Sequence, residues 1–123
     1  MTSRERVQKA INHQIPDRLP LDLGGFQNGI HKKAYNELID HLGLDEKINI
    51  MDPVQQLAQP SEEVLQRFNI DVRYINAHGP EGFDGSVQKN YRNGKLWHDL
   101  EDEFGVVWSM PDDQRLYMDL THH

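Results

Sequence analysis

The sequence predicts an α/β fold that carries a small antiparallel β-meander. In the first two thirds of the chain, strand-forming segments alternate with amphipathic helical segments, which is typical of βα units around a parallel sheet. After Gly82 the pattern changes, and the pair Asn93-Gly94 lies between two β-rich runs. Because a type I′ turn needs positive φ at both central residues, this pair is a strong hairpin signal. The length of 123 residues indicates a single domain.

The first helix is predicted over residues 3–12. Thr2 provides a hydroxyl N-cap and Glu5 a carboxylate three residues later, which together have the form of a capping box. The apolar residues that follow at helical spacing are Val7, Ala10 and Ile11. Pro16 ends this segment, because the residue before a proline is displaced from the α region.

Two strands are predicted on either side of the helical middle of the chain. Leu19–Leu23 places leucines on one face and Asp22 on the other, although Pro20 cannot donate to a strand ladder. Val72–Ala77 is the second β-rich run. Since strands joined by a right-handed crossover are usually parallel neighbours, we expect these two strands to be adjacent and parallel.

Two helices are predicted between these strands, with a short extended piece at 48–50. The 31–42 helix ends before Gly43, a residue suited to the left-handed position after a helix. Its apolar face is formed by Ala34, Tyr35, Leu38, Ile39 and Leu42. The 61–68 helix begins at Ser61, a good N-cap. Its apolar face is formed by Val64, Leu65 and Phe68.

The antiparallel meander is predicted within residues 87–110. Its first two strands are Val87–Arg92 and Lys95–Asp99, on either side of the Asn93-Gly94 turn. Gly105–Met110 supplies a third strand. The meander is therefore expected as an addition to the α/β portion.

Charge and hydropathy exclude several classes of protein. The chain has 13 Lys and Arg residues against 20 Asp and Glu residues, a net charge of −7, and it has no basic stripe of the kind that nucleic-acid binding requires. No run approaches the roughly 18 apolar residues of a membrane span, and the N-terminus shows no secretion signal. Without cysteine there is neither a disulfide framework nor a thiolate zinc site. We predict a cytoplasmic protein that binds neither nucleic acid nor membrane.

Four acidic residues gather at the end of the second meander strand. They are Asp99, Glu101, Asp102 and Glu103. Such a cluster forms either a metal or partner site or a solvated edge that opposes strand pairing. We expect the solvated edge.

The segment Gly24-Gly25-Phe26-Gln27-Asn28-Gly29 has the glycine spacing of a phosphate-binding P-loop. A P-loop also needs a lysine and a hydroxyl directly after its last glycine, and Ile30 and His31 occupy those positions. The segment is therefore expected to be a flexible turn, or a ligand-binding loop at the carboxyl end of a parallel strand.

Asp22 and His78 have the best positions for catalysis. For Asp22, either burial raises its pKa and suits it to proton transfer, or its carboxylate accepts hydrogen bonds from amides of the glycine turn. His78 ends the second predicted strand, where the alternative is a solvent-facing loop histidine. His122 and His123 lie at the chain end and make no defined metal site.

Short motifs along the chain follow an order that is typical of one enzyme superfamily. They are Thr2–Val7, Pro16–Gly25, Gly29–His31 with Ala34 and Tyr35, Asp52 with Gln55–Ala58, Pro60–Phe68, and Asp102–Gly105 before Trp108. By these motifs the chain resembles the uroporphyrinogen decarboxylase superfamily over essentially its whole length. That superfamily contains tetrapyrrole decarboxylases of porphyrin biosynthesis and cobalamin-dependent methyltransferases, which move methyl groups between a corrinoid and a thiol.

The resemblance implies a fold and a set of partners. The superfamily has a (β/α)₈ TIM-type barrel, which needs about 250 residues. Residues 1–123 are therefore expected to form the amino-terminal part of such a barrel, with the antiparallel β-meander inserted. No cofactor is expected within this segment, whereas zinc and a corrinoid are implied for the complete enzyme. The implied partner is a corrinoid protein or a tetrapyrrole substrate.

Departures from the decarboxylase pattern favour the methyltransferase branch. Decarboxylases carry an Arg-Gln-Ala-Gly-Arg segment after the first strand's proline, whose arginines hold substrate carboxylates. Here no arginine occurs between Arg18 and Arg67. Decarboxylases also have an aspartate at the end of the second strand, where this chain has Asn76-Ala77-His78. Tetrapyrrole decarboxylation and a non-catalytic partner-binding module remain the alternatives.

A barrel also implies which side chains face the active-site cavity, because barrel enzymes place their chemistry at the carboxyl ends of the strands. The expected catalytic residues are Asp22 and His78. The expected substrate-binding residues are Gly24, Gly25, Gln27, Asn28 and Asn76. Two strands cannot close a barrel, so the isolated chain is expected to be inactive, to self-associate and to expose Leu19, Leu21, Leu23, Val72 and Tyr74.

Overall fold

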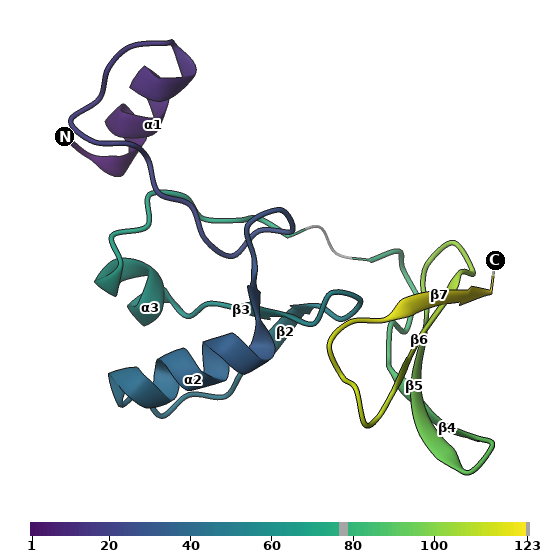
Figure 1. The fold of residues 1–123 in the computed structure, drawn as a ribbon. Coiled ribbons are helices and arrows are strands. Elements are labelled where there is room, and N and C mark those ends of the chain that lie inside the picture. The colour runs from purple at the N-terminus through teal and green to yellow at the C-terminus, as the bar shows by residue number, and fades with distance from the viewer. Residues whose placement is uncertain (77–78, 123) are drawn as a thin grey trace. The chain divides into compact units, whose positions relative to one another are not determined.

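The computed structural model describes residues 1–76 and 79–122, and over these the chain is a mixed α/β protein (Figure 1). Its elements are α1 (Ser3–Ile11), β1 (Ile30–His31), α2 (Lys32–Leu42), β2 (Asn49–Asp52), β3 (Leu57–Gln59), α3 (Glu62–Arg67), β4 (Gln88–Arg92), β5 (Lys95–Glu101), β6 (Val107–Pro111) and β7 (Asp119–His122). They form one sheet of order β1-β3-β2 and another of order β4-β5-β6-β7.

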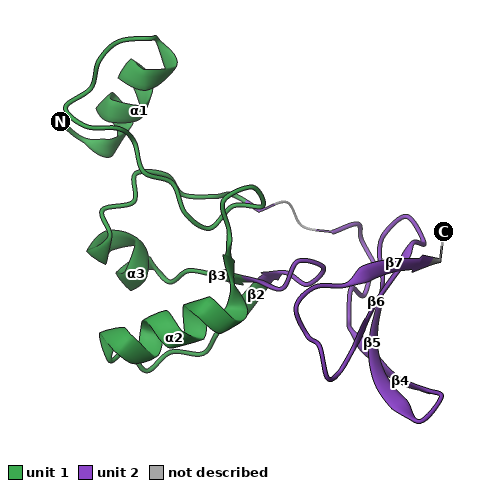
Figure 2. Cartoon of the chain, viewed as in Figure 1, with its two compact units in different colours: residues 1–50, 58–75 green, residues 51–57, 76–123 purple. Residues whose placement is uncertain are grey.

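The chain divides into two compact units (Figure 2). Unit 1 comprises Met1–Ile50 and Ala58–Ile75, and therefore contains the three helices. Unit 2 comprises Met51–Leu57 and Asn76–His123, and contains the four-stranded sheet.

All three predicted helices form, each with the cap that its sequence indicates. At α1, Thr2 and Glu5 complete the capping box, and the backbone N–H of Thr2 donates to the Glu5 carboxylate at 2.8 Å. At α2, Gly43 takes the left-handed conformation with φ of 69°. At α3, the hydroxyl of Ser61 accepts a hydrogen bond from the Val64 amide at 3.3 Å.

The core of unit 1 lies between α2, α3 and the small sheet. Its fully buried residues are Tyr35, Ile39, Ala58 and Val64. Packed against them are Ile30, Leu38, Leu42, Leu44 and Ile48. Two residues predicted on buried faces are exposed: Ala34 lies on the solvent side of α2, and Phe68 is the C-cap residue beyond the last turn of α3.

The prediction of a strand at Leu19–Leu23 is wrong. Pro20 has no N–H to donate to a ladder. The amide of Leu21 donates to the side-chain carboxylate of Asp71 at 2.9 Å instead of to a backbone carbonyl. The segment therefore has strand-forming residues, but only the Leu21 carbonyl makes a backbone hydrogen bond, with the Asp71 amide at 2.8 Å, while the Leu21 amide binds a side chain.

The predicted strand Val72–Ala77 is also not observed over residues 72–76, and Ala77 lies outside the described residues. The carbonyls of Ile70 and Val72 accept hydrogen bonds from the Arg73 guanidinium at 2.8 and 2.9 Å. A side chain from the same segment thus occupies acceptors that a strand would offer to its neighbour.

These two segments nevertheless lie side by side (Figure 1). The hydrogen-bonded pairs are Arg18 with the Asn69 carbonyl, Leu21 with the Asp71 backbone, and Asp22 with the Tyr74 hydroxyl. The partners advance in the same direction along both segments, which is the order of parallel neighbours. The two segments are therefore adjacent, but the predicted pair of parallel strands is not observed, and a barrel stays a prediction.

The meander in unit 2 is confirmed. β4 pairs with β5, β5 with β6 and β6 with β7, all antiparallel. The fourth strand, β7, was not expected from the sequence. Its core is formed by Leu100, Met110 and Met118, against which Val54 and Trp108 pack.

The turn between β4 and β5 has positive φ at both central residues, 50° at Asn93 and 75° at Gly94. We expect Gly94→Ala to destabilise the meander by about 1–2 kcal/mol, because a side chain at positive φ meets its own backbone. A Cβ on Gly94 would have no other heavy atom within 4 Å, so the cost is purely conformational. Amide hydrogen exchange across β4 and β5 measures it.

The matched variant for this turn is Asn93→Gly, which keeps a residue that tolerates positive φ. It should leave exchange protection of β4 and β5 close to that of the parent chain. Equal exchange rates in Gly94→Ala and Asn93→Gly would contradict the turn assignment.

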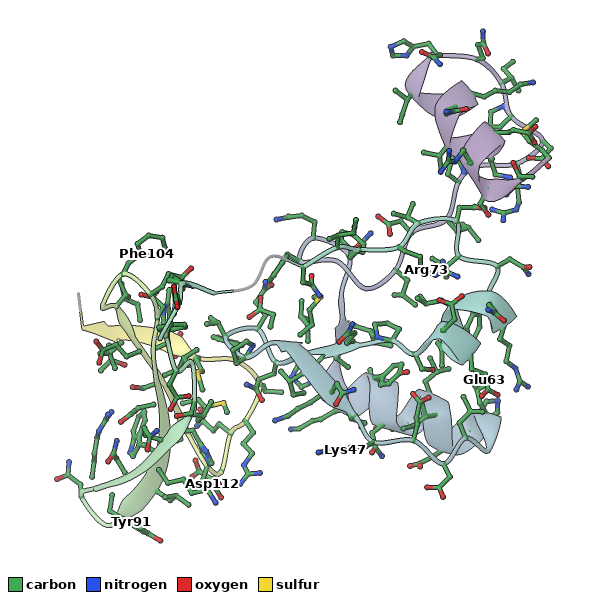
Figure 3. All side chains as sticks on the ribbon, turned by 180° about the vertical axis from the view of Figure 1, so that it is seen from behind. Lys47, Glu63, Arg73, Tyr91, Phe104 and Asp112 are labelled. Atoms are coloured by element: carbon green, nitrogen blue, oxygen red, sulfur yellow. The ribbon has the colours of Figure 1, made fainter. Side chains whose placement is uncertain are left out.

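Large apolar side chains are exposed on both units. Of the residues expected to lack partners, Leu19, Leu21 and Tyr74 are exposed, whereas Leu23 and Val72 are half-buried. Further exposed apolar residues are Ile15, Phe26 and Ile75 in unit 1 and Tyr117 in unit 2. Tyr91 and Phe104 of unit 2, labelled in Figure 3, are also exposed. Self-association of the chain stays a prediction. Within residues 1–76 and 79–122, no helix has the length and apolar character needed to cross a bilayer.

Candidate functional site

A cluster of polar side chains in unit 1 joins the glycine-rich turn to the segment after α3. The hydroxyl of Tyr74 lies 2.7 Å from Asp22 Oδ2 and 3.2 Å from Asn28 Oδ1. The amide of Gly25 donates to Asn28 Oδ1 at 2.9 Å. We call Asp22, Gly25, Asn28 and Tyr74 the Asp22 cluster. It brings together three residues predicted from the sequence and one that was not.

The hydrogen-bond geometry fixes where the protons in the Asp22 cluster lie. A phenol has one proton, and the shorter contact to the charged carboxylate of Asp22 receives it. The hydrogen bond to Asp22, together with desolvation, raises the pKa of Tyr74 above its ordinary value. Tyr74 therefore keeps its proton at neutral pH and donates a hydrogen bond to Asp22.

Gly25 is required by the close approach of Tyr74. A Cβ at this position would collide with the Tyr74 ring. Its φ lies outside the left-handed region, so space is the reason for a glycine here, not backbone freedom. Any larger residue at position 25 would displace the phenol from Asp22.

Neither of the two environments expected for Asp22 is observed, and its predicted catalytic role stays a prediction. Asp22 is exposed, not buried. The acceptor for the Gly25 amide is the carboxamide of Asn28, while the carboxylate of Asp22 binds the Tyr74 hydroxyl. Asn28 already accepts the hydrogen bond of the glycine turn, so the Asp22 carboxylate binds Tyr74, a partner distant in sequence.

The other predicted site residues have different outcomes. Gly24 is buried in the turn, with φ of 105° and its amide 3.4 Å from the Asn28 carbonyl. Gln27 is exposed beside the turn. Asn76 is exposed in unit 2. His78 lies outside the described residues, so its predicted catalytic role is not tested.

A second polar group in unit 1 ties α1 to the adjacent segments. The Arg6 guanidinium donates to Asp17 at 2.7 and 3.0 Å and also pairs with Asp71. Arg18 donates to Asp71 at 2.6 and 3.1 Å. We call Arg6, Asp17, Arg18 and Asp71 the arginine clamp. The side chain of Asp71 has no exposed surface, and that of Arg6 is nearly buried.

The arginine clamp lowers the pKa values of its carboxyls. Hydrogen bonding to Arg6 holds the pKa of Asp17 well below its ordinary value. Burial opposes ionisation of Asp71, but hydrogen bonds from the Leu21 amide and Arg18 outweigh it and lower its pKa. The clamp is thus ionised throughout the neutral range.

α1 is therefore attached through a charge rather than through its apolar residues. Arg6 is its one buried residue, whereas Ile11 is exposed. The apolar spacing that predicted an amphipathic helix gave the correct helix but the wrong buried face. A single arginine with two carboxylate partners decides the attachment.

A third arginine of unit 1 is also paired. Arg73, on the segment after α3 (Figure 3), donates to the two carboxylate oxygens of Glu62 at 2.8 and 2.9 Å. This bidentate contact lowers the pKa of Glu62 to about 2. Arg6, Arg18 and Arg73 therefore all bind carboxylates of this chain.

In unit 2 the expected solvated acidic edge is partly wrong. Asp99 is buried, and it accepts hydrogen bonds from Ser109 at 2.6 Å and Asn90 at 2.6 Å and pairs with Arg92. The Arg92 guanidinium carbon lies 5.3 Å from the centre of the Trp97 ring. Strand alternation explains this, because the residues at these positions share one face of the sheet.

Asp102 also has a structural role. Its carboxylate accepts hydrogen bonds from Trp108 Nε1 and from the amides of Phe104 and Val106, each at 2.9–3.0 Å. These contacts, the Trp108 bond first, lower the pKa of Asp102. Of the four acidic residues, Glu101 and Glu103 are solvent-exposed as expected.

His98 is a buried histidine on β5 in unit 2. Its Nε2 lies 2.6 Å from Asp112, which also pairs with Arg115 (Figure 3). Contacts with His98 and then Arg115 lower the pKa of Asp112. These contacts attach the connection between β6 and β7 to β5.

Potential metal ligands do not gather in the part of the chain that the structure describes. Among those residues, no three or more His, Asp or Glu side chains come close enough to hold an ion. The zinc implied by the resemblance therefore has no ligand set within these residues.

Sequence reasoning missed Tyr74 and the arginine clamp. Tyr74 was assigned to a predicted strand as an apolar side chain, and the strand pattern does not indicate a role for its hydroxyl. Asp17-Arg18 and Asp71 lie far apart in sequence, so nothing local indicated that they meet.

Comparison of the chain with models of known families, with curated protein sequences and with solved structures returns no match.

Proposed function

We propose that this chain forms part of an enzyme of the uroporphyrinogen decarboxylase superfamily, and that the Asp22 cluster lies in its substrate pocket. The reaction we assign is transfer of a methyl group from a corrinoid to a thiol. The proposal rests on the resemblance of the sequence motifs and on one structural observation, which is the position of the Asp22 cluster.

That observation concerns where the Asp22 cluster lies along the adjacent segments. Asp22 follows Leu21, and Tyr74 follows Asp71 after two intervening residues, so both lie beyond the backbone contact between Leu21 and Asp71 in the direction of the chain. In barrel enzymes, ligands bind beyond the carboxyl ends of the strands. The resemblance assigns these two segments to that position, although neither is a strand here. A donor, an acceptor and a glycine turn at that place support a ligand-binding role.

The arginines beside the Asp22 cluster support methyl transfer over tetrapyrrole decarboxylation. A substrate with many carboxylates needs guanidinium groups that are available to bind it. Arg18 and Arg73, which lie on the same two segments as Asp22 and Tyr74, are each committed to carboxylates of the chain itself. These two segments therefore suit a ligand without a ring of carboxylates.

Within this proposal the residues of the cluster have defined roles. Asp22 accepts a hydrogen bond, or a proton, from the bound ligand. Tyr74 holds the carboxylate in place and keeps its own proton, because its pKa is raised. Asn28 keeps the glycine turn closed by accepting from Gly25. Asp22 thus acts from a position that two neighbours determine.

The test is methyl transfer from methylcobalamin to a thiol, followed by the change in corrinoid absorbance. The protein is the polypeptide translated from the whole reading frame that contains these residues. We expect transfer in the parent protein, and a turnover lower by about 10²-fold in Asp22→Ala, because a positioned acceptor is lost. Asp45→Ala, an exposed carboxylate outside the cluster, is the matched control.

Other results would lead to a different function. Removal of carboxyl groups from uroporphyrinogen, without methyl transfer, would assign the decarboxylase reaction. A reading frame that ends at His123, with neither activity, would support a partner-binding module. Equal turnover of Asp22→Ala and Asp45→Ala would remove the Asp22 cluster from the active site.

A further inference from the structure

Two Asn-Gly pairs occur in the chain, Asn28-Gly29 and Asn93-Gly94. In such a pair the asparagine side chain is open to attack by the next backbone nitrogen, because glycine has no side chain to block the approach. The first pair lies in the glycine-rich turn of unit 1, and the second forms the turn between β4 and β5 (Figure 1). The two pairs differ in what holds the asparagine side chain.

The carboxamide of Asn93 is exposed and unrestrained. Asn93 and Gly94 are both solvent-exposed, and no group in the described part of the chain hydrogen-bonds the Asn93 side chain. The turn does not use the Gly94 amide either, since this amide makes no hydrogen bond among the contacts of the described residues. Water and hydroxide therefore reach both of the groups that would react.

Asn28 is restrained where Asn93 is not. It is half-buried, and its Oδ1 accepts a hydrogen bond from the Gly25 amide at 2.9 Å and lies 3.2 Å from the Tyr74 hydroxyl. Rotation of this carboxamide toward the following amide would break these contacts. The same dipeptide is therefore held in one turn and unrestrained in the other.

We propose that Asn93 is a site of spontaneous deamidation through a cyclic imide. Hydroxide removes the proton of the Gly94 amide, whose nitrogen then attacks Asn93 Cγ. A bond forms between these two atoms, and the bond from Cγ to Nδ2 breaks as ammonia leaves with a proton from water, which regenerates hydroxide. Water then opens the imide at one of its two carbonyls. Opening at Cγ gives aspartate, and opening at the backbone carbonyl gives isoaspartate.

The isoaspartate product does not fit the turn. Its main chain runs through Cβ and Cγ, so one additional carbon atom enters the backbone before Gly94. The two-residue turn, with positive φ at both positions, sets the register in which Arg92 lies opposite Lys95. A longer backbone cannot keep this geometry, so conversion loosens β4 from β5. This modification is independent of the reaction assigned to the Asp22 cluster.

The test follows both Asn-Gly pairs in one sample. The folded protein is incubated at mildly alkaline pH and cleaved after glutamate residues, and tandem mass spectrometry locates the replacement of a side-chain amino group by a hydroxyl. We expect Asn93 to convert about tenfold faster than Asn28, the factor for the hydrogen bonds that Asn28 must break. In guanidinium chloride the two rates should converge, because both side chains are then unrestrained.

Asn93→Gly is the matched control for the consequence of conversion. It has no carboxamide at position 93 but keeps a residue that adopts positive φ. After the same incubation, β4 and β5 of the parent protein should lose protection from amide hydrogen exchange in proportion to the isoaspartate present, which electron-transfer fragmentation identifies. Asn93→Gly should keep its protection.

Equal rates at Asn93 and Asn28 in the folded protein would overturn the proposal, and so would the absence of conversion at Asn93. Full exchange protection of β4 and β5 in protein that carries isoaspartate at position 93 would overturn the structural consequence.

Discussion

Replacement of Asp71 by alanine is expected to lower the free energy of unfolding of unit 1 by about 3 kcal/mol. The Asp71 side chain has 0% exposure and binds two arginines and the Leu21 amide. Without it, the nearly buried Arg6 and the amide of Leu21 lose a partner that water cannot replace. Urea unfolding followed by circular dichroism measures the change. Asp45→Ala, which removes an exposed carboxylate, should unfold as the parent chain does.

The arginine clamp also makes the stability of the folded protein depend on pH in the acid range. The folded-state pKa values of Asp17 and Asp71 lie below their ordinary values. The folded state therefore binds fewer protons than the unfolded state in this range, and its stability falls as the pH decreases from about 4 toward the lowered values. In Asp71→Ala this loss with decreasing pH should be smaller. An identical pH dependence in the two proteins would show that the clamp does not form.

Tyr35→Ala is expected to have the largest effect in the core of unit 1, about 3–5 kcal/mol. Tyr35 is 1% exposed and contacts the other members of the buried cluster. Its hydroxyl accepts a hydrogen bond from the Ser61 amide at 2.8 Å and donates to Glu46. Truncation therefore removes a ring from the core, the hydrogen bond that links α2 to the N-cap of α3, and the hydrogen bond to Glu46. Thermal or urea unfolding measures the loss.

Tyr35→Phe separates the contribution of the hydroxyl from that of the ring. It keeps the ring and should cost about 1–3 kcal/mol, because the Ser61 amide and Glu46 lose their partner. Tyr91→Phe is the matched control, since Tyr91 is 78% exposed on β4 and its change should be close to zero. Equal stabilities of Tyr35→Phe and Tyr91→Phe would contradict the role of the buried hydroxyl.

Features that depend on a few consecutive residues were predictable from the sequence. The capping box at Thr2, the left-handed Gly43, the Ser61 cap and the Asn93-Gly94 turn all form as their local patterns indicate. In each case a side chain or a φ preference acts on backbone within about four residues. The turn also determined the register of β4 against β5.

Features that depend on distant partners were not predictable in this way. The leucine pattern at 19–23 predicted a strand, but the Leu21 amide binds a carboxylate fifty residues away in sequence. Arg6 replaced the apolar residues as the buried face of α1, because Asp17 and Asp71 meet it there. β7 was missed because its short segment does not by itself indicate a strand. It becomes a strand through its pairing with β6.

The candidate site shows the same division. The sequence by itself indicated that Asp22 precedes the glycine-rich turn that contains Gly25 and Asn28. Only the tertiary structure decided which hydrogen-bond partner each of them has. Asn28 takes the Gly25 amide and Tyr74 arrives from the segment after α3, so the Asp22 carboxylate is held by a phenol and not by the turn. The reason is physical: a hydrogen-bonding group takes whichever partner the folded chain brings within reach, and sequence spacing specifies only the near ones.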